Sequence, residues 1–136
     1  NIDVALEFFD GQSLSFTCKN LGLEGVLAQS DFISLHVPGG DLIGAAEIAK
    51  MKDGVFLLNA ARGGVINEEA LLDALESGKV AGAGLDVFKN EPTPAVKVLM
   101  NGKVSLTPHI GAATGEAQDR IGTELAAHID SLAASL

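Results

Sequence analysis

The chain has 136 residues with a net charge of −9, 4% aromatic residues and a single cysteine. This length suits one domain with a buried core, while the lone Cys18 excludes an internal disulfide and fits a reducing, cytoplasmic compartment. The acidic balance argues against nucleic acid and anionic membranes as partners, because phosphate binding needs a basic face. The first residues are acidic where a secretory leader would be basic, and no apolar run approaches the length of a membrane span, so we expect neither.

Short apolar runs alternate with helix-like segments along the chain. We expect strands at Val4–Phe9, Phe32–His36, Val55–Leu58, Val80–Val87 and Val104–Thr107. We expect helices at Leu14–Asn20, Leu23–Gln29, Leu42–Met51, Asn67–Ser77, Ala95–Met100 and Thr114–Ala134. Apolar strands joined through helices predict a single α/β domain over 1–136, with a Rossmann-like parallel sheet between two helical layers.

Two of the helices carry clear start signals. Asn67 is a good N-cap, acidic residues occupy the first turn after it, and Gly78 supplies a left-handed stop. Thr114 caps the last helix in the same way. Each helix has an apolar stripe: Leu71, Leu72 and Leu75 in the first, and Ile121, Leu125, Ile129 and Leu132 in the second.

Three reactive side chains each follow the end of a predicted strand. Arg62 follows VFLL, Glu91 follows VAGAGLDV and His109 follows VSLT. Ligands of parallel α/β sheets bind at the carboxyl ends of the strands, so these residues are expected to share one site. An arginine can hold a carboxylate, and a histidine beside an acid can move a proton. The alternatives are a surface ion pair for Arg62, a solvated loop acid for Glu91 and an ordinary surface histidine for His109.

Other candidates have competing explanations. Asp10 could bind ribose hydroxyls after the first strand, but turn chemistry with Gly11 explains it equally well. Asp86 ends an apolar strand, where an unpartnered carboxylate would be costly, and this favours a functional role. From their positions alone, His36 and His128 are interpreted as structural. No cysteine and histidine cluster predicts a metal site, and there is no nucleophile-elbow motif.

The glycine-rich phosphate loop of dinucleotide-binding folds is missing from the sequence. The best match to G-x-G-x-x-G is the segment Gly82–Val87, GAGLDV. It lacks the last glycine and falls inside a predicted strand instead of at a strand-to-helix turn, so we reject it.

Three long strings give the chain a family resemblance: DFISLHVP (31–38), AKMKDGVFLLNAARGGVINEEALLDALESGKVAGAGLDVFKNEP (49–92) and VSLTPHIGAATGEAQ (104–118). At these strings the chain resembles the D-2-hydroxyacid dehydrogenase family, closest to its D-3-phosphoglycerate dehydrogenase branch. The resemblance implies reversible hydride transfer between NAD(H) and a 2-hydroxy or 2-keto acid, with 3-phosphoglycerate as the nearest candidate. It also implies a cytoplasmic homo-oligomer, such as a dimer, that serves serine biosynthesis.

The resemblance also implies residue roles. Arg62 would bind the substrate carboxylate and carbonyl, His109 would be the general acid and base, and Glu91 would pair with His109 and tune it. On the cofactor side, Asp10 resembles the ribose-binding acid and Asp86 resembles the carboxamide partner. The remaining cofactor contacts implied are His36, Val37 and Pro38 at the adenine side, and Ala60, Ala61, Arg62, His109 and Gly111 at the nicotinamide side.

The family pattern has parts that this sequence lacks, namely the first strand with its phosphate loop and the substrate domain. We therefore expect a partial NAD-binding domain. One hypothesis is that Val4–Phe9 closes the gap and pairs with Val55–Leu58, which would give the flavodoxin-like order 2-1-3-4-5. The alternatives to an enzyme are a non-catalytic binding or interaction module, or a proteolytic fragment that retains family residues.

Overall fold

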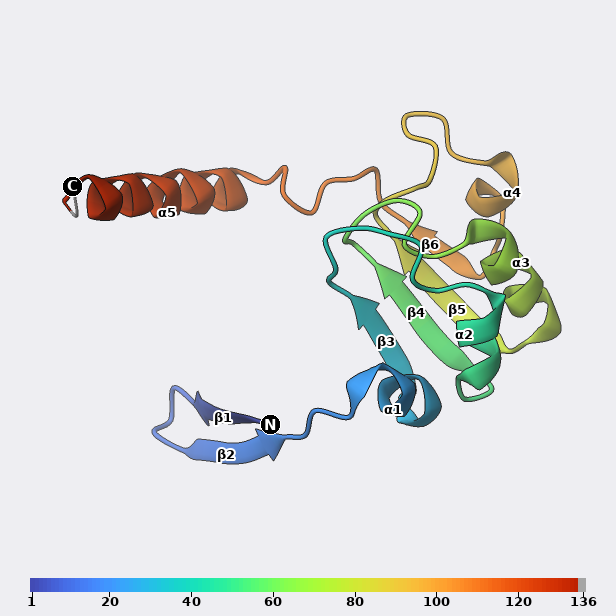
Figure 1. The fold of residues 1–136 in the computed structure, drawn as a ribbon, viewed down its shortest axis with the longest axis horizontal. Coiled ribbons are helices and arrows are strands. Elements are labelled where there is room, and N and C mark those ends of the chain that lie inside the picture. Colours follow the sequence, from blue (N-terminus) through green and yellow to red (C-terminus); the bar gives the residue numbers. More distant parts are fainter. Residues whose placement is uncertain (135–136) are drawn as a thin grey trace.

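The computed structural model describes residues 1–134, which form an α/β body, a β-hairpin and a long C-terminal helix (Figure 1). The body holds a four-stranded parallel sheet in the order β3-β4-β5-β6. Its strands are β3 (Phe32–Leu35), β4 (Val55–Asn59), β5 (Val80–Leu85) and β6 (Val104–Leu106). Its helices are α1 (Gly22–Gln29), α2 (Ala45–Lys50), α3 (Glu68–Ser77) and α4 (Val96–Leu99). These elements confirm the predicted α/β class and the predicted positions of the four strands.

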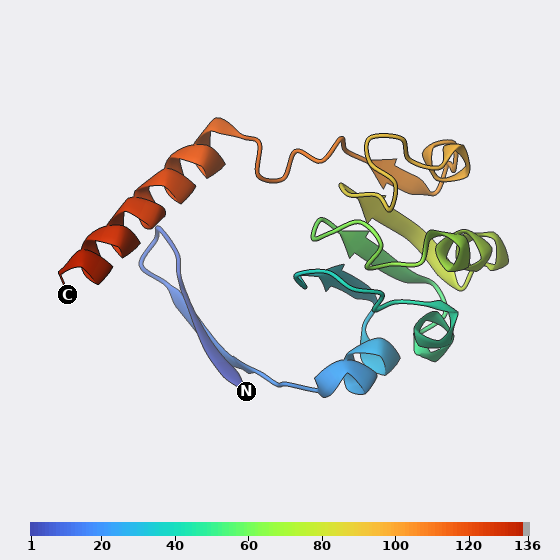
Figure 2. The ribbon, with the colours of Figure 1, turned by 45° about the horizontal axis from the view of Figure 1, so that its top comes forward.

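One face of this sheet makes the core. Along β4 the residues alternate between buried and exposed, so that Val55 and Leu57 point into the core while Phe56 and Leu58 do not. Helices α2, α3 and α4 cover the buried face, and α1 packs beside α2 (Figure 2). On the opposite face Phe32 and Phe56 stack with their ring centroids 5.0 Å apart, and Phe32 is 68% exposed. The described residues therefore do not form the third layer of the predicted arrangement.

The N-terminal segment is a hairpin outside this sheet. β1 (Ile2–Glu7) pairs antiparallel with β2 (Ser13–Cys18), although we expected a helix at Leu14–Asn20. That prediction is wrong because SLSFTC alternates at the period of a strand and the preceding Asp10-Gly11 makes a tight turn. Gly11 has a φ of 80°, a left-handed value that glycine adopts without a steric penalty.

The hypothesis that the first strand closes up the sheet is also wrong. β3 pairs directly with β4, with Phe32 opposite Phe56 and Leu35 opposite Asn59. This pairing leaves no gap for β1 to fill, so the order 2-1-3-4-5 does not form. β1 instead satisfies its hydrogen bonds with β2, and the hairpin lies apart from the sheet in both views (Figures 1 and 2).

Helix α3 begins and ends where its capping residues predict. The Asn67 side chain accepts a hydrogen bond from the Ala70 amide at 3.1 Å, and Gly78 is left-handed with a φ of 81°. Leu71 and Leu75 are buried, and Leu72 is partly buried. Both ends of α3 are therefore set by residues that lie next to them in the sequence.

The last helix, α5 (Gly115–Ala133), is capped by Thr114 as predicted, since the Thr114 hydroxyl accepts from the Ala117 amide. It extends away from the body, and its apolar stripe is exposed (Figure 1). Among residues 1–134 no helix is both long enough and apolar enough to cross a membrane.

Candidate active site

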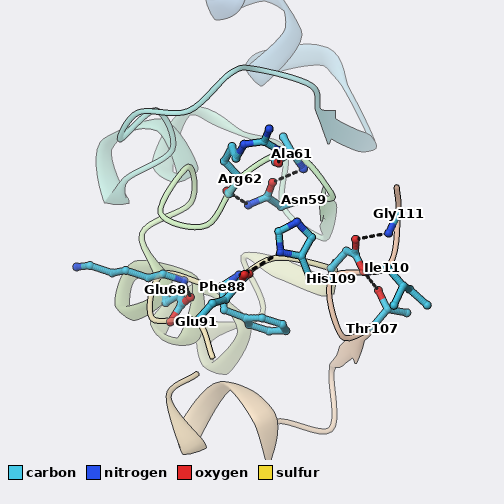
Figure 3. A network of polar contacts seen from close by, with 12 residues as sticks. Asn59, Ala61, Arg62, Glu68, Phe88, Glu91, Thr107, His109, Ile110 and Gly111 are labelled. Carbon is cyan, nitrogen blue, oxygen red and sulfur yellow. Dashed lines mark hydrogen bonds and ion pairs between the residues drawn. The ribbon is translucent and has the colours of Figure 1, made fainter. Parts of the chain in front are cut away.

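The three reactive side chains lie beyond the carboxyl ends of three adjacent strands. Arg62 follows β4, Glu91 follows β5 and His109 follows β6. Because the strands are parallel neighbours, their following loops meet at one edge of the sheet. Figure 3 shows the His109 ring between Glu91 on one side and the loop of Asn59 and Arg62 on the other. The common location expected from the sequence is therefore found.

Glu91 and His109 contact each other directly. His109 Nδ1 lies 2.7 Å from Glu91 Oε2, and the second Glu91 oxygen accepts a hydrogen bond from the Phe88 amide at 2.8 Å. The hydrogen bond from His109, followed by that from Phe88, lowers the pKa of Glu91 below its ordinary value. An ionised carboxylate can only accept hydrogen bonds, so His109 Nδ1 carries the donated proton. The other ring nitrogen, Nε2, is left to exchange protons with a ligand.

The backbone of His109 takes an uncommon conformation. Its φ is 55°, in the left-handed region that histidine adopts more readily than most residues other than glycine, asparagine and aspartate. Its side chain is half exposed, whereas that of Glu91 is 34% exposed. A pocket of about 450 Å³ adjoins the pair. Both residues line it, together with mostly apolar neighbours that include Phe88, Leu106 and Pro108. The pair is therefore accessible to a small molecule.

The Asn59 side chain holds the Arg62 loop through two hydrogen bonds. The Asn59 side chain donates to the Arg62 carbonyl at 3.0 Å and accepts from the Ala61 amide at 3.1 Å. Gly63 packs so closely on the Phe88 carbonyl that an added Cβ would lie 1.9 Å from its oxygen. The Arg62 guanidinium donates to the Ala61 carbonyl at 2.7 Å and is otherwise exposed at the edge of the sheet.

Asp86 is buried, and its carboxylate accepts three hydrogen bonds. One carboxylate oxygen accepts from the Thr107 hydroxyl at 2.5 Å and the Ile110 amide at 2.9 Å. The other accepts from the Gly111 amide at 3.0 Å. Burial raises the pKa of Asp86, but these hydrogen bonds and the nearby His109 together outweigh it, so that the pKa is lowered. Asp86 therefore holds the His109 loop at the Thr107 side chain before it and at two backbone amides after it.

The remaining cofactor candidates are divided between this edge and the hairpin. His36 follows β3, where its Nε2 lies 2.8 Å from the Ser34 hydroxyl, and Val37 packs against the core. Pro38, Ala60, Ala61 and Gly111 also lie in loops after strand ends. Asp10, by contrast, lies in the β1–β2 turn, where its carboxylate accepts from the Gln12 amide at 3.1 Å. The structure does not bring Asp10 to the other candidates, so its ribose-binding role stays a prediction.

Sequence reasoning missed three residues that shape the site. Asn59 and Gly63 fix the Arg62 loop, and Glu68 at the start of α3 accepts a hydrogen bond from the Lys89 amide at 2.7 Å. A signal for Asn59 was present, since an amide that ends an apolar strand needs partners when it is buried. Within residues 1–134 no group of three or more His, Cys, Asp or Glu side chains is arranged to hold a metal ion.

Comparisons with known proteins place these features in a family. Residues 10–111 match the family described as D-isomer specific 2-hydroxyacid dehydrogenase, NAD binding domain. D-3-phosphoglycerate dehydrogenase of Mycobacterium bovis is 48% identical over 110 residues, which cover 78% of this chain and 21% of that protein. Hydroxypyruvate reductase of Thermotoga maritima is 54% identical over 110 residues, covering 76% of this chain and 36% of that protein.

A solved structure agrees with these matches. D-lactate dehydrogenase from Aquifex aeolicus, in complex with NAD and lactic acid, superposes with a TM-score of 0.67 at 34% identity. The match covers 83% of this chain and 40% of the other chain. The chain thus spans between 21% and 40% of the length of these three relatives. It belongs to the D-isomer specific 2-hydroxyacid dehydrogenase family, within the NAD-binding domain.

Proposed function

We propose that Arg62, Glu91 and His109 form the catalytic site of an NAD-dependent oxidoreductase that interconverts D-2-hydroxy acids and 2-keto acids. The observation that carries the proposal is the 2.7 Å contact of His109 Nδ1 with Glu91 Oε2, beside the Arg62 loop at the carboxyl edge of the sheet. Family membership supports NAD as the cofactor. On this proposal the chain is the distal part of an NAD-binding domain, and other segments supply the phosphate loop and the substrate domain.

Arg62 would bind the acid. A guanidinium offers five N–H donors in a planar fork that matches a carboxylate bidentately. One Arg62 nitrogen donates to the Ala61 carbonyl, which directs the side chain along the loop and leaves further donors for a ligand. Charge-assisted bonds of this kind are about twice as strong as neutral ones and fix the orientation of the bound acid. The proposal then requires the keto group of the bound acid to face His109.

His109 would move the proton. The cofactor, when bound, supplies or accepts the hydride at the substrate's second carbon. In the direction of reduction, His109 Nε2 gives a proton to the carbonyl oxygen, and in the direction of oxidation it takes that proton back. The ionised Glu91 holds the Nδ1 proton in place, so Nε2 is the atom that exchanges. General acid and base catalysis of this kind contributes about 10²- to 10⁴-fold in rate.

The residues present fit the nicotinamide end of such a cofactor. Asp86 uses three of its roughly four acceptor positions on Thr107, Ile110 and Gly111, so one remains for a carboxamide donor. Gly111 helps, because an added Cβ would come within 3.1 Å of Asp86 Oδ2. Ala60 and Ala61 would line the same end, and His36, Val37 and Pro38 the adenine side. Asp10 as the ribose acid rests on the family resemblance alone.

The relatives suggest which acid to test first. The similar proteins include several named D-3-phosphoglycerate dehydrogenase and one named hydroxypyruvate reductase. We propose 3-phosphoglycerate as the first substrate candidate, with hydroxypyruvate as the main competitor. Both are small carboxylic acids with the oxidisable or reducible oxygen on the second carbon, as the Arg62 and His109 roles require.

The test uses the natural protein, including the segments that on this proposal supply the phosphate loop and the substrate domain. It follows NAD⁺ reduction with 3-phosphoglycerate and D-lactate, and NADH oxidation with hydroxypyruvate and glyoxylate. We expect His109→Ala to lower kcat by about 10²- to 10⁴-fold, since it removes the proton-transfer group. His128→Ala is the matched control, because His128 is an exposed histidine on α5. Turnover that is equal in wild type and His109→Ala, or no turnover with any of the four acids, would contradict the proposal.

A further inference from the structure

We infer that Asn59 is a positioning residue that sets the Arg62 loop and joins it, through Asp86, to the His109 loop; the inference rests on the proposed function. Asn59 touches no reacting atom in the proposed reaction. It acts through the backbone of Arg62, and its own side chain lies beneath the loop (Figure 3).

The environment of Asn59 requires both halves of an amide group. The side chain is buried, with 3% of the residue exposed. Its Nδ2 donates to the Arg62 carbonyl at 3.0 Å, while its Oδ1 accepts from the Ala61 amide at 3.1 Å. One partner needs a donor and the other needs an acceptor, so the orientation of the amide is determined. Ionised aspartate has no donor for the Arg62 carbonyl, and leucine has neither a donor nor an acceptor. The shorter serine side chain has one hydroxyl in place of the two polar atoms of the amide.

A second link runs from Asn59 to the other catalytic loop. The Asn59 carbonyl accepts from the Asp86 amide at 2.9 Å, between the ends of β4 and β5. The Asp86 carboxylate in turn binds the Ile110 and Gly111 amides that follow His109. Asn59 and Asp86 are the two buried polar residues among those that the structure describes. Hydrogen bonds through these two buried residues therefore connect the loop of the carboxylate-binding residue with the loop of the proton-transfer residue.

This connection matters because the two loops must act on one small molecule. Arg62 fixes the acid group, and His109 must reach an oxygen on the adjacent carbon. A misplacement on the order of 1 Å can cost about 10²-fold in rate. The substitution Asn59→Asp keeps the size of the side chain and the acceptor for the Ala61 amide. The substitution also places a second carboxylate oxygen against the Arg62 carbonyl oxygen. The two oxygens repel each other, and the Arg62 loop is released.

The test is a double-substitution cycle on the natural chain. Asn59→Asp should lower kcat/KM for the 2-keto acid by about 10²-fold when Arg62 is present. In an Arg62→Ala background the same substitution should have an effect of no more than about 3-fold, because the guanidinium that the loop positions is gone. Asn101→Asp is the matched control: Asn101 Oδ1 accepts from the Lys103 amide at 2.9 Å, and aspartate retains that acceptor. Equal losses in both backgrounds would overturn the inference.

A second measurement, which does not depend on catalytic activity, completes the test. Asn59→Asp should speed amide hydrogen exchange over residues 60–65, while exchange in β3 stays at the wild-type rate. Unchanged exchange over 60–65 would overturn the positioning role even if the chain has no turnover. If exchange rises throughout the chain, Asn59→Ser, which adds no buried charge, replaces it in both measurements. A wild type that reduces no 2-keto acid would count against the proposed function, and the exchange result would still decide the role of Asn59.

Discussion

The Nδ1 atom of His109 lies 2.7 Å from Oε2 of Glu91, and this contact joins the loops after β6 and β5. Glu91 also accepts from the Phe88 amide at 2.8 Å through Oε1. Both carboxylate oxygens are therefore in use, one on the histidine and one on its own loop. The contact with Glu91 Oε2 keeps a proton on His109 Nδ1. The hydrogen bond from Phe88 to Oε1 holds the loop that carries Glu91.

Glu91→Gln should therefore impair the site although the side chain keeps its size. Glutamine has a single acceptor oxygen, so either the Phe88 amide or His109 Nδ1 loses its acceptor. We expect kcat/KM for the 2-keto acid to fall by about 10²-fold, at the lower end of general acid and base contributions. Steady-state NADH oxidation measures this.

Glu68→Gln is the matched control for that substitution. Glu68 Oε1 accepts from the Lys89 amide at 2.7 Å, and the oxygen of glutamine can still accept there. Its kcat/KM should stay near the wild-type value. If Glu91→Gln and Glu68→Gln behave alike, the contact between Glu91 and His109 has no catalytic role.

Asp86 should make the stability of the protein depend on pH in a defined direction. Its pKa in the folded state is lowered from the ordinary 3.8, because hydrogen bonds from Thr107, Ile110 and Gly111 outweigh the effect of burial. The unfolded chain then binds the proton first as pH falls, and protonation favours unfolding. The stabilising contribution is complete above the ordinary pKa and is lost as pH falls through the lower folded value.

Asp86→Asn isolates this contribution. At neutral pH we expect a loss of about 1–3 kcal/mol in the free energy of unfolding, because asparagine leaves a part-buried backbone amide without an acceptor. The difference from wild type should shrink as pH falls below the ordinary pKa of 3.8, where Asp86 of the unfolded chain takes up a proton before Asp86 of the folded chain does. Urea unfolding across this range measures it. Asp73→Asn, on the exposed face of α3, should change stability by less than about 0.5 kcal/mol. A difference for Asp86→Asn that does not vary with pH would contradict the assignment.

The location of the site was predictable, but its supporting contacts were not. The positions of Arg62, Glu91 and His109 after three apolar strands were enough to predict one shared edge. The grip of Asn59 on the Arg62 loop depends on the side chain turning back under its own loop. No periodicity in the sequence encodes such a turn. The contact of Gly63 with Phe88 joins two loops far apart in sequence, so it also needed coordinates.

The fold shows the same division between local and long-range information. Asn67 and Gly78 bound α3 because caps act within one turn, and those predictions are confirmed. The helix predicted at Leu14–Asn20 is wrong, because this segment alternates at the period of a strand and follows the Asp10-Gly11 turn signal. The Asp10-Gly11 turn joins β1 to β2, so the partner of β1 follows from sequence that lies outside β1 itself.

The N-cap of α3 tests whether local sequence sets the start of this helix. Asn67→Ala removes the acceptor for the Ala70 amide and should lower the free energy of unfolding by about 1 kcal/mol. Asn67→Asp keeps an acceptor at the same place and adds a negative charge at the helix N-terminus, so it should be neutral or slightly stabilising. Thermal or urea unfolding of both variants measures this. Equal destabilisation by alanine and aspartate would show that the hydrogen bond does not stabilise the helix.

Gly63 tests a contact between two loops that lie far apart in the sequence. A Cβ at this position would lie 1.9 Å from the Phe88 carbonyl oxygen, so Gly63→Ala must push the Arg62 loop away from the loop that leads to Glu91. We expect a loss of about 1–3 kcal/mol in the free energy of unfolding, the usual cost of overpacking. We also expect the KM for the 2-keto acid to rise, since Arg62 moves with the loop. Gly102→Ala is the control, because an added Cβ there meets nothing within 4 Å, and it should change stability by less than about 0.5 kcal/mol. Wild-type stability and KM in Gly63→Ala would mean that the two loops are not held together by this contact.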